Sequence, residues 1–227
     1  MKIVVAAMAL NEAYHIREFC ENFSFADKIV ISDGGSTDDT VKLAEQYPNV
    51  KVVHFTERIE FKDGSFMNPE GKHHNFVLSH AREYNPDWIM MQAPDHRFNY
   101  FLYKDIRQLL ETAKKDGVRT RMYYTYLRKE YFTELGKGDN FVLAFRGYLP
   151  VYLDEHDPFN CTYFNLPKKD ECLHLKRPYC MLHHTWPTPE IIKSKMERYA
   201  AWGRALPNPP EKEPVWGKLV PLEEWMQ

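Results

Sequence analysis

KIVISDGGSTDDT, residues 28–40, is the stretch of sequence that decides the fold. It begins as a short apolar run, as a buried strand does, and the run ends at Asp33 and the pair Gly34-Gly35. Two glycines permit a tight turn with positive φ, and either Ser36 or Thr37 can cap a helix that follows. The stretch therefore predicts a strand, a polar turn and a helix, the unit from which parallel α/β sheets are built.

The same alternation continues on both sides of this stretch. The spacing of apolar residues predicts strands at 2–8, 50–55 and 87–92 and helices at 12–23, 72–84 and 189–204. Residues 56–71 are expected to form a long loop, and His73 and His74 to be solvated at the start of a helix. Repeated units of this kind predict an α/β fold with an open, mainly parallel twisted sheet flanked by helices.

The length and composition indicate one compact domain. With 227 residues and 44% hydrophobic content, we expect a single domain at 1–205, with one half at 1–100 and the other at 101–205. Residues 206–227 are rich in proline at their start and predict a tail. Trp216 and Trp225 in this tail are expected to dock on the body or on a second copy of the chain, so a homo-oligomer stays open.

The charge and the cysteines exclude some classes of function. A net charge of -2 provides no basic field for nucleic acid. No segment has the roughly 20 apolar residues of a transmembrane helix, so we expect a cytoplasmic protein whose membrane contact, if any, is peripheral and at the inner face. The four cysteines form no CxxC pair and are expected to be free thiols. A zinc site is the alternative, with these ligands: Cys172, His174, Cys180 and His183.

Polar residues follow three of the predicted strands. Asn11-Glu12 comes after the first strand, Asp33 after the second and Asp95 after the fourth. Because ligands of open α/β sheets bind at the carboxyl ends of the strands, these residues predict one shared crevice.

Four segments resemble a known family. MALNEAYHI (8–16), VISDGGSTDDT (30–40) and DWIMMQAPDHR (87–97) are similar to the nucleotide-binding half of family-2-type GT-A glycosyltransferases. LHHTWPTPEIIKSKMERY (182–199) resembles a segment of the lipopolysaccharide-core-type branch. The resemblance implies a GT-A-like fold and an inverting transfer of a sugar. The donor would be a nucleotide-diphosphate sugar, a UDP-sugar by the family's habit, and the acceptor a hydroxyl of a carbohydrate or another molecule.

The resemblance also assigns residues. Asp33 would contact the base or ribose of the donor, and the other donor-binding positions would be Ala9, Asn11, Glu12, Gly34, Asn75 and Ala93. Asp95 and His183 would hold Mn²⁺ or Mg²⁺, with His184 as the neighbouring substitute. The chain departs from the family pattern at Ala93 and Gly34, where acidic residues are usual. His96 is a residue that can replace part of the lost coordination.

An inverting transfer needs a carboxylate that removes the proton of the acceptor hydroxyl. The candidates are Asp154, Glu155 and Asp157 in YLDEHDPFN, ahead of Glu130, Asp170 and Glu171. Ala93 leaves two alternatives open: a catalytically inactive relative that binds nucleotide or sugar, and a nucleotidyltransferase of similar fold.

Overall fold

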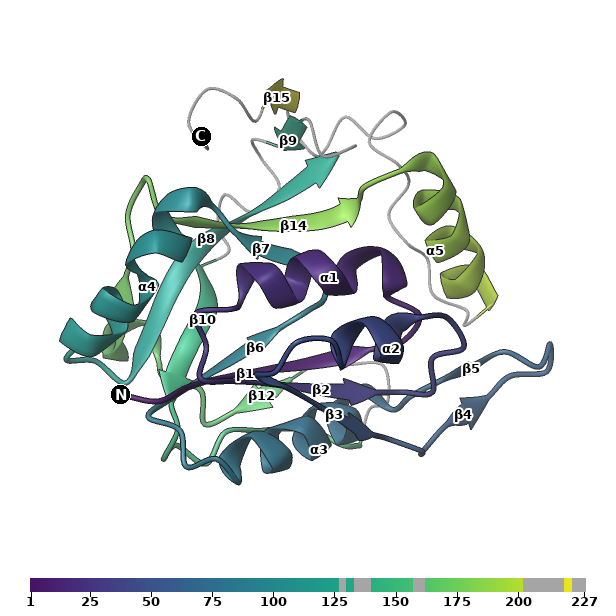
Figure 1. The fold of residues 1–227 in the computed structure, drawn as a ribbon, viewed down its shortest axis with the longest axis horizontal. Helices are drawn as coiled ribbons and strands as arrows, with labels where there is room; N and C mark the ends of the chain where they lie inside the picture. Colours follow the sequence, from purple (N-terminus) through teal and green to yellow (C-terminus); the bar gives the residue numbers. More distant parts are fainter. Residues whose placement is uncertain (127–129, 133–139, 157–161, 202–218, 222–227) are drawn as a thin grey trace.

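The computed structural model describes residues 1–126, 130–132, 140–156, 162–201 and 219–221. One large sheet runs through this part of the chain, with helices on both of its faces (Figure 1). Its strands lie in the order β15-β9-β8-β10-β6-β1-β2-β3, and β7, β13 and β14 join it off this path. The predicted α/β class with an open sheet flanked by helices is confirmed.

The first half of the chain forms the parallel part of the sheet. Strands β3, β2, β1 and β6 are parallel neighbours, and the register of β1 with β2 places Ala9 opposite Asp33. The elements of this half are β1 (Ile3–Ala9), α1 (Ala13–Asn22), β2 (Lys28–Asp33), α2 (Thr40–Ala44), β3 (Val50–His54), β4 (Ile59–Glu60), β5 (Phe66–Met67), α3 (Glu70–Arg82) and β6 (Trp88–Gln92).

The second half is of mixed direction. Strand β10 is antiparallel to β6 and β8, whereas β13 and β14 run parallel to β8. The elements of this half are β7 (His96–Phe98), α4 (Tyr100–Thr112), β8 (Gly117–Tyr126), β9 (Glu130–Phe132), β10 (Asn140–Arg146), β11 (Tyr152–Leu153), β12 (Tyr163–Phe164), a short 3-10 helix (Lys169–Glu171), β13 (Cys172–His174), β14 (Cys180–Trp186), α5 (Pro189–Ala201) and β15 (Leu219–Pro221). In the tail, β15 pairs with β9.

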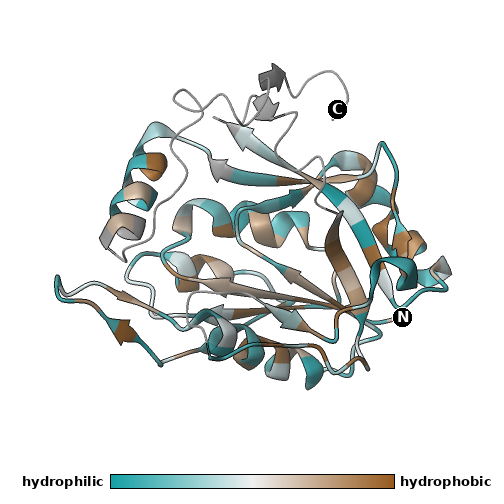
Figure 2. Cartoon of the chain, turned by 180° about the vertical axis from the view of Figure 1, so that it is seen from behind, coloured by the Kyte–Doolittle hydropathy of each residue, from teal (hydrophilic) through white to brown (hydrophobic). Residues whose placement is uncertain are grey.

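Apolar side chains cover both faces of the sheet. Ile16 and Phe19 of α1 and Leu102 of α4 belong to the cluster on one face, whereas Val77 and Leu78 of α3 belong to the cluster on the other. Figure 2 shows hydrophobic residues along the central strands and on the helix faces that pack against them. Burial on two faces explains why β1 and β6 are almost continuously apolar.

Three local predictions were wrong. Residues 56–71 contain the hairpin β4–β5, which projects from the body as an arm (Figure 1), and α3 already begins at Glu70. Helix α2 is limited to Thr40–Ala44 and has no side-chain cap. Ser36, one of the two expected caps, instead accepts a hydrogen bond from the Asn11 backbone at its Oγ, because the turn is tied to the end of β1 rather than to the helix.

The carboxyl ends of β1, β2 and β6 all face one side of the molecule. Helix α5 and the β4–β5 arm lie at this side (Figure 1). The expected crevice is therefore bordered by segments from both halves of the chain. Among the helices in the described ranges, none is long and apolar enough to cross a membrane.

Candidate nucleotide and metal site

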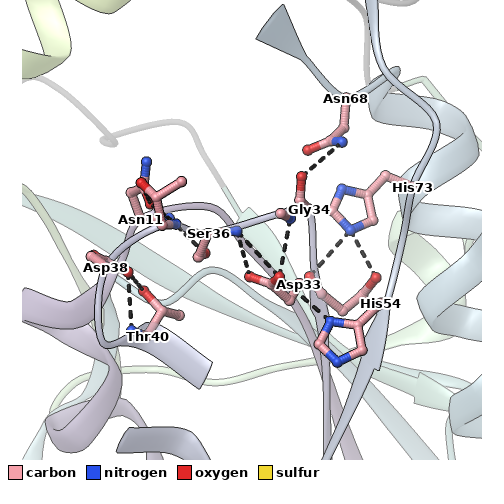
Figure 3. A network of polar contacts seen from close by, with 12 residues as sticks. Asn11, Asp33, Gly34, Ser36, Asp38, Thr40, His54, Asn68 and His73 are labelled. Carbon is pink, nitrogen blue, oxygen red and sulfur yellow. Dashed lines mark hydrogen bonds and ion pairs between the residues drawn. The ribbon is translucent and has the colours of Figure 1, made fainter. Parts of the chain in front are cut away.

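The turn after β2 is held by the carboxylate of Asp33. Asp33 Oδ2 accepts a hydrogen bond from the Gly35 N–H at 3.0 Å, and Oδ1 accepts one from the Ser36 N–H at 3.1 Å (Figure 3). His54 Nδ1 lies 3.6 Å from Oδ2. Asp33 itself is only 3% exposed. The turn is thus fixed by hydrogen bonds to its own Asp33 side chain. Asp33 is the residue that the family resemblance assigns to the donor nucleotide.

The end of β1 is joined to the same turn. The Gly34 N–H donates to the Ala9 carbonyl at 2.8 Å, and the Thr37 N–H donates to Asn11 Oδ1 at 2.8 Å. Asn11 has a φ of 55°, in the left-handed region that Asn tolerates better than most residues. The Glu12 N–H donates to Thr40 Oγ1 at 2.7 Å. The structure therefore brings four of the predicted donor-binding positions together with Asp33: Ala9, Asn11, Glu12 and Gly34.

The β4–β5 arm packs on this turn and explains its glycines. A Cβ at Gly34 would lie 2.0 Å from Asn68 Oδ1, so a side chain at this position would require Asn68 to move. Asn68 Nδ2 donates to the carbonyls of Gly34 and Glu57. Gly35 has a φ of 99°, and the guanidinium of Arg58 lies against it. The absence of an acidic residue at position 34 follows from this close approach.

His73 and His74 are not solvated, contrary to the prediction. His73 is 3% exposed, its Nε2 lies 2.8 Å from Ser32 Oγ, and its ring stacks on Phe55 at 4.4 Å. Burial lowers the pKa of His73 to about 4, although the Ser32 carbonyl and Asp33 act in the opposite direction. Both histidines contact neighbouring elements: His73 packs on β2, and His74 Nδ1 lies 3.2 Å from the Tyr163 hydroxyl of β12.

A second group of side chains lies after β6. Asp95 precedes β7, and β7 pairs with β14 so that His96 is opposite His183. Asp95 Oδ2 lies 3.2 Å from His183 Nε2. One ligand atom from each of Asp95, His96 and His183 lies within 4.8 Å of the other two. We call these three residues the cluster. The sequence separation of Asp95 and His183 is 88 residues, so the predicted convergence of the two is met by strand pairing.

Lys195 of α5 contacts the cluster. Its Nζ lies 3.0 Å from Asp95 Oδ2, the same oxygen that His183 approaches. Burial raises the pKa of Asp95, but its contacts with His183 and Lys195 outweigh burial and hold this pKa well below its usual range. Asp95 is therefore a carboxylate that is buried and ionised, and its charge is balanced by a lysine.

His184 is not a member of the cluster. Its Nδ1 lies 2.7 Å from Thr125 Oγ1, and its backbone N–H donates to the Asp95 carbonyl at 2.8 Å. Neighbouring residues of a strand point to opposite faces, so only one of the two histidines reaches Asp95. His96 provides the second imidazole instead.

The zinc alternative is not assembled either. Cys172 Sγ contacts the Pro167 carbonyl and His174 Nε2 the Lys169 carbonyl, whereas His183 faces Asp95. Three cysteines of the described ranges are free and buried, as predicted: Cys20, Cys172 and Cys180. Cys161 lies outside those ranges.

Arg97 holds the segment that carries the cluster. Its guanidinium donates to the carbonyls of Pro94 and His96, which flank Asp95, at 2.7 and 2.6 Å. It also donates to the His15 carbonyl of α1 at 2.8 Å. Arg97 is 6% exposed. It therefore connects the cluster to α1, the helix that begins just after Asn11 and Glu12.

The acidic segment after β11 is attached to α3. The Asn75 side chain donates to the Leu153 carbonyl at 2.9 Å and accepts from the Leu153 N–H at 2.7 Å. It also donates to Glu155 Oε1 at 2.7 Å. Asp154 Oδ1 accepts from the His156 N–H. Asn75, a predicted donor-binding position, thus attaches the acidic segment to α3. Asp157, the third candidate base, lies outside the described residues.

A cavity lies between the cluster and α3. Its volume is about 190 Å³. Ala93, a predicted donor-binding position, lines it together with His96. The other lining residues are Met8, His74, Met91, Gln92, Phe141 and Tyr163.

Lys195, Arg97 and Asn68 are residues of this site that the sequence alone does not single out. Their roles depend on contacts with segments 100, 82 and 34 residues away. The one available signal was the place of Lys195 in the segment that resembles the lipopolysaccharide-core-type branch.

Comparison with known proteins identifies the fold. No protein-family profile matches the sequence, and no curated protein matches it. The crystal structure of residues 1–349 of S. aureus TarS has a TM-score of 0.55 at 17% identity and covers 95% of this chain and 69% of that one. The same fragment in complex with UDP-GlcNAc has a TM-score of 0.55 at 16% identity, with 88% and 64% covered.

Glucosyl-3-phosphoglycerate synthase from Mycobacterium tuberculosis, in complex with Mn²⁺, UDP and glucosyl-3-phosphoglycerate, is more distant. Its TM-score is 0.40 at 21% identity, with 56% of this chain and 45% of that one covered. That score is too low for its ligands to bear on this chain. TarS and the synthase are GT-A-type glycosyltransferases. The likeness to TarS confirms the predicted GT-A-like fold, and at 17% identity it shows the fold alone. In the TarS structure that is not limited to residues 1–349, the part that matches this chain is 38% of the TarS chain.

Proposed function

We propose that this protein is a metal-dependent glycosyltransferase that moves a sugar from a UDP-sugar to an acceptor hydroxyl with inversion. The observation that carries the proposal is the contact of Asp95 with His183, at the same edge of the sheet as the turn that Asp33 holds. Both lie at the carboxyl ends of parallel strands, where ligands of open α/β sheets bind. An ion-binding group next to a nucleotide-binding turn is what a nucleotide-diphosphate donor requires.

The residues of the cluster fit a divalent cation. One carboxylate oxygen and two imidazole nitrogens within 4.8 Å of one another can share an ion, and this mixture of ligands favours Mn²⁺ over Mg²⁺. His183 Nε2 is the ring nitrogen that lies beside Asp95, so it is the nitrogen that can serve as a ligand. When bound, the ion would act as a Lewis acid that stabilises the negative charge of the leaving diphosphate.

The chain's own residues would bind and orient the donor. The turn at 33–36 and the end of β1 form the nucleotide side of the crevice, and Arg58 adds a positive charge beside Gly35. Lys195 adds a second positive charge at the cluster. As a diphosphate enters, the two cations can balance its charge, which lowers the cost of separating the nucleoside diphosphate from the sugar.

Asp154 and Glu155 are our candidates for the general base, and Asp157 stays a prediction from the sequence. The contacts of Asn75 fix the backbone at Leu153 and reach Glu155. A base must be held in place to accept a proton as the hydroxyl attacks. Replacement of each carboxylate by its amide, with the fold checked by circular dichroism, separates the three.

The finer predictions remain proposals. We propose that the chain belongs to the lipopolysaccharide-core-type branch, acts on a carbohydrate or similar hydroxyl-bearing acceptor in the cytoplasm or at the inner face of the membrane, and has its catalytic domain at 1–205.

The test is a hydrolysis assay with several nucleotide sugars and Mn²⁺, with and without chelator. We expect slow release of nucleoside diphosphate that stops when the ion is removed and in the Asp95→Asn variant. Release of monophosphate or pyrophosphate would indicate nucleotidyl transfer instead. Binding of nucleotide without any turnover would indicate an inactive relative.

A further inference from the structure

The cavity beside the cluster has walls that are mainly apolar. Met8 lies at the end of β1 and Met91 near the end of β6, and Ala93 and Phe141 complete the apolar lining. None of these side chains can form a hydrogen bond with a hydroxyl group, apart from the weak acceptor sulfur of Met.

The polar side chains of the lining are already paired. Gln92 donates from Nε2 to the Leu143 carbonyl, and its Oε1 lies 3.1 Å from His96 Nδ1. The Tyr163 hydroxyl lies 3.2 Å from His74 Nδ1. Burial lowers the pKa of His74 to about 3, so its ring is neutral near pH 7. A hydroxyl that entered the cavity would therefore lose its water and find few partners, which is costly.

The position of the cavity indicates which part of a ligand reaches it. His96 belongs both to the cluster and to the cavity lining. A group attached to a diphosphate at the cluster would therefore lie next to the cavity, because His96 borders both. In a nucleotide-diphosphate sugar, that group is the sugar.

We propose that this cavity receives the N-acyl group of the donor sugar, so that the protein selects an acetamido sugar over the corresponding unsubstituted hexose. The inference rests on the proposed function and adds a substrate class to it. An acetamido group ends in a methyl, which gains from burial among Met8, Met91 and Phe141. A hexose hydroxyl at the same place gains nothing from these walls.

The size of the cavity agrees with this occupant. A volume of about 190 Å³ exceeds the roughly 150 Å³ of an apolar cavity that holds a benzene-sized ligand. It therefore has room for an acetyl group. Ala93 contributes to this room, because the acidic residue that the family usually has at this position would fill space and bring a charge.

The experiment compares the affinities of UDP, UDP-glucose and UDP-GlcNAc by calorimetry with Mn²⁺ present. We expect UDP-GlcNAc to bind at least about tenfold more tightly than UDP-glucose, since one extra apolar carbon in an apolar pocket is worth about 10- to 200-fold. Met8→Trp, which fills the cavity, should remove this preference and leave the affinity for UDP unchanged. Met8→Leu is the matched control, because it keeps volume and polarity, and it should retain the preference.

Phe141→Trp fills the cavity from β10 and serves if Met8→Trp fails to fold, which a thermal unfolding scan detects. Equal affinities of the wild-type protein for UDP-glucose and UDP-GlcNAc would overturn the inference, as would a preference that survives both tryptophan variants. If UDP binds and the preference is absent, only the inference fails. If UDP itself does not bind, the proposed function fails and the inference with it.

Discussion

Replacement of Lys195 by methionine should strengthen the binding of Mn²⁺ to the protein in the absence of nucleotide. Lys195 Nζ lies 3.0 Å from Asp95 Oδ2, and the two side chains are 17% and 10% exposed. An ion that uses this oxygen must displace the ammonium group first. Methionine keeps most of the length and apolar volume of the side chain, so the variant removes mainly the charge.

The magnitude follows from this contact. Two unit charges 3 Å apart at an effective dielectric constant of about 20 attract each other by roughly 5 kcal/mol before desolvation is counted. A hydrogen bond between charged groups contributes about 1.5–3 kcal/mol net. Without that competing contact, the dissociation constant of Mn²⁺ should fall by about 10- to 150-fold.

The assay is titration of Mn²⁺ followed by the electron paramagnetic resonance signal of the free ion. Lys193→Met on the same helix is the matched control, because Lys193 is 78% exposed and lies 3.9 Å from Glu197. We expect no change in Mn²⁺ affinity for this control. An Mn²⁺ affinity of Lys195→Met that stays within twofold of the wild type, or falls, would refute the competition between lysine and ion.

Four further predictions concern the site and the stability of the fold. Asp95→Asn should weaken Mn²⁺ binding by at least about 100-fold, because it removes the anionic ligand; the same resonance titration measures this. Arg97→Met should lower the free energy of unfolding by about 3–5 kcal/mol, since three carbonyls lose a charged donor; urea denaturation measures this. Gly34→Ala should cost about 1–3 kcal/mol and weaken UDP binding, because the new Cβ would meet Asn68 Oδ1, and the same denaturation and calorimetry apply. His74 has a pKa of about 3 in the folded protein and about 6.5 in the unfolded chain, so the unfolded chain takes up a proton first as the pH falls. The free energy of unfolding should therefore decrease as the pH drops from 6.5 toward 3. His74→Gln should make this slope shallower by about 1.4 kcal/mol per pH unit, which urea denaturation at several pH values measures.

The parallel half of the sheet could be predicted from the sequence because its signals are local. The apolar runs before Asn11, Asp33 and Asp95 mark buried strands, and the polar residues after them mark strand ends. The apolar spacing of the strands and helices, together with the glycine turn after Asp33, was enough to predict their succession along the chain. Boundaries shifted by one or two residues, as at α3. The burial of His73 and His74 could not be predicted, because it depends on contacts with β2 and with Tyr163.

The second half could not be predicted in this way, because its arrangement depends on pairing between distant segments. Strand β14 runs parallel to β8 and antiparallel to β7. The local sequence at 180–186 does not predict which strands it pairs with. The sequence proposed that Asp95 and His183 meet through a resemblance to a family, not through spacing. It left His183 and His184 as alternatives, because the choice depends on which face of β14 points toward Asp95.

The same reason explains the residues that were missed. A lysine on an amphipathic helix is usually solvated, and only the placement of α5 brings Lys195 to Asp95. Position 34 departs from the family's acidic residue because Asn68 from the arm occupies that space. Neither contact leaves a trace in local composition.

The position of β14 between two other strands has a consequence for how an ion would be received. His183 pairs with His96 on one side and with Tyr124 on the other, so strand neighbours restrain its main chain on both edges of β14. When an ion binds to the cluster, the site can then adjust only through side-chain rotation and through movement of α5. Capture of a cation should accordingly leave amide exchange in β14 unaltered, while exchange in α5 changes as Lys195 separates from Asp95.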